Sequence, residues 1–144
     1  MNKKYRGIKL DGTAVEVHVD NNIISSAVPI TPTPDLPYLL PVLVDLQHNG
    51  ALGQAYNNIT GSADDIAALH KIAGHLLSHG VGRVLATFTT TDYPRLERAA
   101  KALNKILDSD ELLNSLFPGI FHEGVFISPD PSSIKPSNTD QGYI

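Results

Sequence analysis

A short alternation of apolar and polar residues marks the first thirty positions of the chain. In "TAVEVHVD", Val15, Val17 and Val19 alternate with polar residues, which is typical of a strand with one buried face. An Asp-Gly turn signal separates this run from "YRGIKL", and a pair of asparagines separates it from "IISSAVPI". The pattern predicts a β-meander over residues 5–30. His18 alternates with the valines, so we expect it on the polar, solvated side.

The pattern changes after the proline-rich stretch "TPTPDLPYLLP", in which no regular element can persist. Three continuous apolar runs follow: "PVLVDLQHNG", "VGRVLATFTTT" and "PGIFHEGVFIS". Runs of this kind are typical of strands that are buried on both faces in a parallel sheet. We therefore predict three buried strands within residues 42–127, and a loop over residues 129–144.

Two helical patterns separate these strands. The first, "SADDIAALHKIAGHLLSHG", has Ser62 as a candidate N-cap, Asp64 and Asp65 in its first turn, and Gly80 just past its end. The second covers residues 93–116 and opens near Pro94. The order β-α-β-α-β predicts an α/β fold with parallel pairing. The first helix should bury one apolar stripe, made of Ile66, Leu69, Ile72, Ala73, Leu76 and Leu77.

All three strands carry their polar residues late, at the ends where parallel α/β sheets bind ligands. Strict alternation would place Asp45, Gln47 and Asn49 on one face and Val44, Leu46 and His48 on the other. Thr87 and Thr89 end the second strand, and they also read as ordinary strand residues. Gln47 and Asn49 could equally cap a loop. Glu123 is a carboxylate in an apolar run, so it needs a cation, a metal or a solvent-filled strand end.

Composition narrows the classes of function. The chain has 144 residues, no cysteine and a net charge of -4, which excludes disulfides and thiolate ligands and gives no electrostatic footprint for nucleic acid. The start of the chain has no signal-peptide pattern and no window is apolar enough to cross a membrane, so we expect a cytoplasmic protein. His75 and His79 have metal-ligand spacing, but no third ligand lies near them in sequence.

The motifs "VDLQHNG" and "FHEGVFISPD" resemble the N-terminal part of N-acetylglucosamine-6-phosphate deacetylases, which belong to the amidohydrolase superfamily. The first strand matches that family at Pro41, Val44-Asp45, Gln47, Asn49 and Gly50. The third matches at Glu123-Gly124, and "HGVGRVLATFTT" is similar to a further stretch. The chain departs from the family pattern at Val42, Phe121 and Val125.

The resemblance implies a (β/α)8 barrel, or TIM barrel, preceded by a small β-sandwich. Residues 1–40 would then hold sandwich strands and a connector, and residues 41–144 would hold barrel strands one to three. The barrel is incomplete here, because a whole one needs about 250 residues. Glu123 would bind a divalent metal, expected to be Zn²⁺, with Gln47 and Asn49 lining the site and His122 turned outward. One metal per full-length chain is expected, because neutral amides replace the histidines of two-metal sites.

The implied reaction is hydrolysis of the N-acetyl amide of N-acetylglucosamine 6-phosphate, a step of amino-sugar catabolism. The general acid/base Asp and the metal-binding histidines of the family are expected downstream, so this chain would hold no catalytic residue. We therefore expect the chain alone to be inactive, and to self-associate through its open strand edges. The alternative is a non-catalytic α/β binding or regulatory module derived from a partial barrel.

Overall fold

The computed structural model describes residues 2–124. The chain divides into two compact units, one of residues 1–41 and one that begins at Val42. The division falls in the proline-rich stretch, next to the boundary predicted from composition. None of the helices in the described part combines the length and apolar character needed to cross a membrane.

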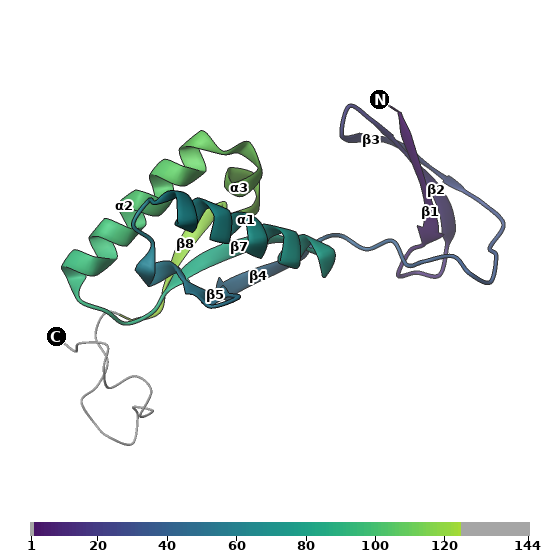
Figure 1. Cartoon of the computed structure of the whole chain (residues 1–144). Coiled ribbons are helices and arrows are strands. Elements are labelled where there is room, and N and C mark those ends of the chain that lie inside the picture. The colour runs from purple at the N-terminus through teal and green to yellow at the C-terminus, as the bar shows by residue number, and fades with distance from the viewer. Residues whose placement is uncertain (1, 125–144) are drawn as a thin grey trace, which may run out of the picture. The chain divides into compact units, whose positions relative to one another are not determined.

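The first unit is an antiparallel β-meander of three strands, β1 (Lys3–Ile8), β2 (Ala14–Asp20) and β3 (Ile23–Pro29), in that spatial order (Figure 1). The predicted turns close it. Asn21 and Asn22 have φ of 49° and 63°, the left-handed values that a two-residue hairpin turn requires and that asparagine tolerates. The meander predicted from alternation is therefore present.

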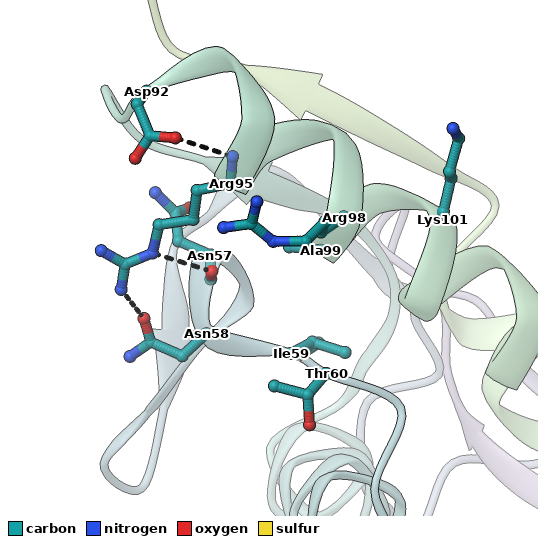
Figure 2. A pocket seen from close by; sticks show the side chains of 9 residues that line it. All are labelled: Asn57, Asn58, Ile59, Thr60, Asp92, Arg95, Arg98, Ala99 and Lys101. Atoms are coloured by element: carbon teal, nitrogen blue, oxygen red, sulfur yellow. Dashed lines mark hydrogen bonds between the residues drawn. The ribbon is translucent and has the colours of Figure 1, made fainter.

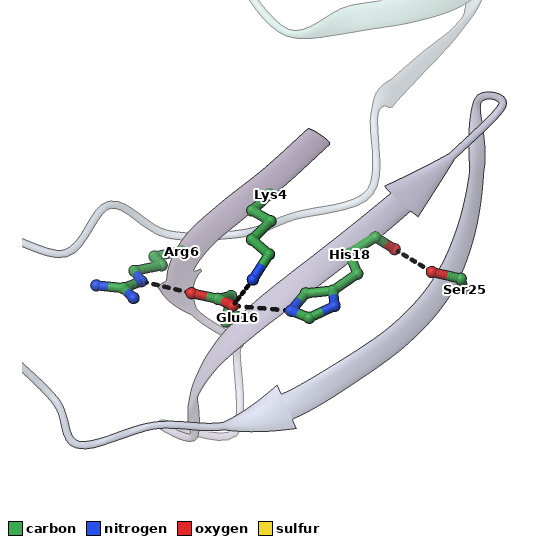
Figure 3. Close-up of polar contacts among 5 residues, drawn as sticks. All are labelled: Lys4, Arg6, Glu16, His18 and Ser25. Atoms are coloured by element: carbon green, nitrogen blue, oxygen red, sulfur yellow. Dashed lines mark hydrogen bonds and ion pairs between the residues drawn. The ribbon is translucent and has the colours of Figure 1, made fainter. Parts of the chain in front are cut away.

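Glu16, in the middle of β2, is the centre of an ionic cluster on this sheet (Figure 3). Its carboxylate lies 2.8 Å from Arg6 Nε, 2.8 Å from His18 Nε2 and 3.2 Å from Lys4 Nζ. The hydrogen bonds from Arg6, His18 and Lys4 lower the pKa of Glu16 to about 2. The prediction that His18 lies on the polar side of its strand is confirmed, because it shares that face with Glu16. Its ring is half-buried and bonded to Glu16, however, and not only solvated.

The second unit is built on a parallel sheet of order β4-β7-β8, formed by β4 (Leu43–His48), β7 (Val81–Phe88) and β8 (Gly119–His122) (Figure 1). Helix α1 (Ala63–Ser78) connects β4 to β7. Helices α2 (Tyr93–Ser109) and α3 (Glu111–Leu116) connect β7 to β8. The predicted β-α-β-α-β order is present.

The second helical region differs from its prediction as one continuous helix, because it breaks at Asp110. This residue has an extended conformation, with φ of -135°, and its side chain accepts a hydrogen bond from Leu113 N at 3.0 Å. It therefore ends α2 and caps α3. The stretch after β4 forms a small hairpin of β5 (Gly50–Ala51) and β6 (Gln54–Ala55), followed by the 3₁₀ turn η1 (Tyr56–Asn58).

Helix α1 begins and ends where the sequence predicted. Ser62 is the N-cap and forms a capping box with Asp65, and the left-handed Gly80 (φ 78°) follows its end. The core lies between the helices and one face of the sheet. Its buried residues include Val84, Ala86 and Phe88 from β7, Leu69, Ile72, Ala73 and Leu76 from α1, and Leu103, Ile106, Leu113 and Phe117 from the later helical region. Leu77, predicted in the buried stripe, is exposed instead.

The prediction that all three strands are buried on both faces was wrong for β4 and β8. Val44 and Leu46 in β4 are 58% and 64% exposed, and Phe121 in β8 is 38% exposed. Each of these strands pairs only with β7 in residues 2–124, so both are edge strands there. The remainder of the predicted third strand, beyond Gly124, and the predicted C-terminal loop lie outside the described residues.

Candidate functional site

A hydrogen bond joins the carboxyl ends of the two outer strands. Asn49 follows β4 and Glu123 follows β8, and Asn49 Nδ2 donates to Glu123 Oε2 at 3.0 Å. Two further hydrogen bonds attach the end of β8 to β7 and the residues after it. Glu123 N donates to the carbonyl oxygen of Phe88, the last residue of β7, at 2.9 Å, and Thr90 Oγ1, just beyond β7, donates to Gly124 O at 3.0 Å. The sheet therefore brings together two polar residues that are 74 positions apart, as their location at the strand ends predicted.

Glu123 is not a carboxylate inside a buried strand. It lies one residue beyond the end of β8 and its side chain is exposed. Its neighbour His122 pairs with Phe88, whose side chain is in the core, so His122 is on the helix side of the sheet and Glu123 follows on the other side. Of the partners that the sequence left open for Glu123, residues 2–124 supply the solvent-facing strand end. The amide of Asn49 is a further partner that was not among those alternatives.

The face assignment predicted for the end of β4 was wrong, because the strand contains a bulge. Asp45 pairs with Val84 and His48 pairs with Ala86, so three steps along β4 match two steps along β7. Since Val84 and Ala86 face the helices, both Asp45 and His48 lie on that side, and Asn49 follows on the other. Strict alternation had separated Asp45 from His48. The bulge is what turns Asn49 toward Glu123.

His48 contacts the core. Its Nδ1 lies 2.6 Å from the hydroxyl oxygen of Tyr56, a fully buried residue of η1. Burial raises the pKa of Tyr56 and lowers the pKa of His48, so the pair is a neutral phenol beside a neutral imidazole at pH 7. The signal for this contact in the sequence is slight, since Tyr56 lies in a stretch without periodicity. The pair supports the strand end structurally.

Gln47 is exposed, and no hydrogen bond joins its side chain to Glu123 within residues 2–124. Its backbone N donates to Asp45 Oδ1 at 3.0 Å, which helps to shape the bulge. The structure therefore brings Asn49 to Glu123 but leaves Gln47 at the strand end without such a bond. That Gln47 lines a substrate site stays a prediction.

The threonines that end β7 support the fold. Thr87 is fully buried and its hydroxyl donates to Leu85 O at 3.2 Å. Thr89 is bound by Asn57, whose amide nitrogen donates to Thr89 O at 3.0 Å and whose amide oxygen accepts from Thr89 N at 3.1 Å. Sequence reasoning missed Asn57, because nothing in the irregular "GALGQAYNN" stretch distinguishes it from its neighbour.

The donors in the described part of the chain do not form a complete metal centre. In residues 2–124 no three His, Cys, Asp or Glu side chains converge as ligands. His75 and His79 have ring centroids 4.5 Å apart, but one ring nitrogen of His79 lies 2.8 Å from the carbonyl oxygen of His75 and no third ligand joins them. Glu123 has one carboxylate oxygen bound to Asn49 and one without a hydrogen bond in the described region, so it could supply a single ligand.

A β-meander followed by a parallel β-α-β-α-β unit, with a polar pair at the strand ends, places the chain among mixed α/β folds. No family model and no curated protein matches the sequence. Solved structures do match. Among them are N-acetylglucosamine-6-phosphate deacetylases from Pasteurella multocida (19% identity, TM-score 0.65) and Thermotoga maritima (18%, 0.70), and a mutant of this enzyme from Mycobacterium smegmatis in complex with N-acetyl-D-glucosamine-6-phosphate (20%, 0.63).

These matches cover 96%, 98% and 88% of this chain, in the same order, but only 41%, 38% and 34% of the solved chains. The chain thus spans about two fifths or less of their length. At such identities the likeness shows the fold alone. The chain has the fold of the N-terminal segment of N-acetylglucosamine-6-phosphate deacetylases, as its strand-end motifs predicted.

Proposed function

We propose that this chain is part of a metal-dependent hydrolase that removes the acetyl group of N-acetylglucosamine 6-phosphate. The observation that carries the proposal is the 3.0 Å hydrogen bond between Asn49 and Glu123 at the strand ends. Ligands of parallel α/β folds bind at those ends. The likeness of the fold to deacetylases over nearly the whole chain supports it as well.

Glu123 would contribute one carboxylate ligand to a divalent metal, expected to be Zn²⁺. Asn49 would hold one carboxylate oxygen and so fix the direction in which the other faces the metal. In such sites the metal polarises the scissile carbonyl and lowers the pKa of a bound water. Residues 2–124 provide one ligand of this set, so the metal-binding histidines and the general acid/base Asp would come from elsewhere in a longer protein.

The 144-residue chain alone is expected to be inactive, because a single carboxylate neither holds zinc nor provides a general base. A second candidate function applies to the isolated chain: a non-catalytic α/β binding or regulatory module. No group of three potential metal ligands converges in the described region, which favours this reading for the chain by itself.

The test is an assay for free amine released from N-acetylglucosamine 6-phosphate in the presence of Zn²⁺. It compares the 144-residue chain with the protein translated from the complete reading frame that contains it. We expect turnover only from the latter, and its loss in Glu123→Gln. Asp35→Asn is the matched control, since it removes the charge of an exposed carboxylate from residues 1–41. An active Glu123→Gln variant, or an inactive complete protein, contradicts the proposal.

A further inference from the structure

A hollow of about 960 Å³ lies between the first half of α2 and the segment of residues 57–60 (Figure 2). Its floor includes the buried side chains of Ile59 and Ala99. It contains neither Asn49 nor Glu123 among its lining residues, so it is separate from the site proposed for the hydrolase. The proposed function makes no use of it.

Three basic side chains line the hollow, Arg95, Arg98 and Lys101. They recur at every third position of α2, a spacing that places side chains as neighbours on one helix surface. Among the lining residues that lie within positions 2–124, Asp92 is the one carboxylate. Its Oδ1 already accepts a hydrogen bond from Arg95 N at 2.8 Å, as the N-cap of α2. The hollow is therefore positively charged in a protein whose net charge is -4.

The two arginines keep their positive charge available. Arg95 donates to neutral oxygens, from Nε to Asn57 O at 3.4 Å and from its terminal nitrogen to the side-chain oxygen of Asn58 (Figure 2). Arg98 makes no hydrogen bond or ion pair within residues 2–124, and neither arginine takes part in a salt bridge there. Lys101 pairs with Glu97, but both side chains are exposed, so this pair neutralises little.

These donors match a phosphate group. A guanidinium presents parallel N–H donors that fit phosphate oxygens in pairs, and the start of α2 adds the positive end of its dipole. The amide of Asn58 uses its oxygen for Arg95, which leaves its nitrogen to donate. The volume is that of a small-molecule site, whereas a nucleic acid would need a basic surface on a larger scale.

We propose that this hollow binds the phosphate group of a small phosphorylated molecule, through Arg95, Arg98 and the amide of Asn58. This binding is separate from the metal site proposed at Glu123. Arg98 is the informative position, because it is exposed and makes no bond in the described region, so its replacement should leave the fold intact.

The experiment titrates the 144-residue chain with inorganic phosphate at constant ionic strength and follows backbone amide shifts by NMR. We expect saturable binding that shifts the amides of Asn58 and Arg98. Arg98→Gln should weaken it at least about tenfold, as expected for loss of a charge-assisted hydrogen bond. Lys71→Gln removes the same charge from α1 outside the hollow and should change the affinity little, because distant exposed charges are screened.

Equal weakening by Lys71→Gln, or a response that never saturates, overturns the proposal. Arg95→Gln tests the second arginine, with circular dichroism to verify that the loss of its bonds to the η1 region leaves the fold unchanged.

Further titrations compare N-acetylglucosamine 6-phosphate with N-acetylglucosamine. Tighter binding of the sugar phosphate than of inorganic phosphate assigns the hollow to a phosphorylated sugar, and equal binding assigns it to free phosphate. Binding of the unphosphorylated sugar as tightly as its phosphate contradicts the proposal.

Glu123→Gln separates this proposal from the hydrolase. The variant should bind phosphate like the unmodified chain, because Glu123 does not line the hollow. Loss of phosphate binding in Glu123→Gln contradicts a separate site. A failed deacetylase assay, in contrast, would contradict the proposed hydrolase without changing the result expected for phosphate binding.

Discussion

Asn57 and Thr89 bind each other through three hydrogen bonds across 32 positions of sequence. The Asn57 amide nitrogen donates to the carbonyl and hydroxyl oxygens of Thr89, at 3.0 and 3.1 Å, and the amide oxygen accepts from Thr89 N at 3.1 Å. One side chain thus satisfies both backbone groups of the residue that follows β7. It fixes the loop after β4 to the end of the central strand.

Replacement of Asn57 by alanine should lower the free energy of unfolding by about 2–3 kcal/mol, because the backbone groups of the half-buried Thr89 lose their partners and a buried side chain is truncated. Denaturant unfolding followed by circular dichroism measures the change. Asn114→Ala is the control: this asparagine is exposed on α3, and its loss should cost less than about 0.5 kcal/mol. Equal effects of the two substitutions would show that Asn57 has no special role.

Asp65 should make stability depend on pH under acidic conditions. Burial raises the pKa of Asp65, but hydrogen bonds from Thr60 and Ser62 outweigh it and hold the value at about 2. The unfolded state binds the proton more readily, at its ordinary pKa of about 3.9. Stability is therefore full above pH 4 and falls by about 2 kcal/mol as the pH drops toward 2.

The check on Asp65 is a set of unfolding curves between neutral and acidic pH. Asp65→Asn should be less stable at neutral pH and should lose less on acidification than the unmodified chain. Asp64→Asn changes the neighbouring first-turn carboxylate, which is exposed, and should keep the acid-dependent loss. An unchanged acid slope in Asp65→Asn would show that other carboxylates cause it.

The phenol of Tyr56 should stay protonated in the folded protein at a pH where exposed tyrosines ionise. Its burial raises its pKa above the ordinary value of a tyrosine. Phenolate absorbance during an alkaline titration should therefore be the same for Tyr56→Phe and for the unmodified chain until unfolding begins. The substitution should also cost about 1–2 kcal/mol of stability, since the ring nitrogen of His48 loses its partner. A smaller absorbance change in the variant before unfolding would contradict this.

The isolated chain is predicted to self-associate through the uncovered side of its sheet. Val44 and Leu46 are more than half exposed, and β4 and β8 are edge strands in the described region, which leaves backbone groups available for pairing. Light scattering after size exclusion should detect a dimer or a larger species, and Val44→Glu should shift it toward the monomer. Leu112→Glu places the same charge on exposed α3 and should not. A monomer at micromolar concentration in the unmodified chain is the contrary result.

The complete protein is predicted to bind one equivalent of zinc, and Glu123→Gln should bind much less. Elemental analysis after dialysis measures both values. One equivalent is expected because Gln47 and Asn49 are neutral amides, which bind zinc poorly compared with imidazole. Two equivalents in the unmodified protein would contradict this assignment.

Features set by neighbours in sequence were predictable. Ser62 and Asp65 cap α1 because an N-cap acts within one turn, and Asn21 and Asn22 close a hairpin because their side chains tolerate left-handed backbone. The meeting of Asn49 with Glu123 was also predictable in outline, because parallel strands end at one edge of the sheet.

Features set by tertiary contact were not predictable. A continuous apolar run is typical of a strand that is buried on both faces, but it does not reveal that the side chain of Val44 is exposed within residues 2–124. The break at Asp110 was hidden inside one helical pattern, because aspartate caps a helix as readily as it occupies an exposed position. The bonds between Asn57 and Thr89 depend on a loop conformation that has no periodic signal.

The bulge in β4 changes which residues of the strand face the helices and which face the other side of the sheet. Before it, alternation assigns Asp45 to the helix side; after it, His48 has that side and Asn49 the opposite one. Without the bulge, the three steps from Asp45 to His48 would place His48 away from Tyr56 and would turn Asn49 toward the helices. Removing one of the two residues between Asp45 and His48 would instead restore regular alternation and leave His48 and Asn49 on their present sides. The extra residue therefore decides which of the two makes the core contact and which the strand-end contact, so spacing at this point matters as much as residue identity.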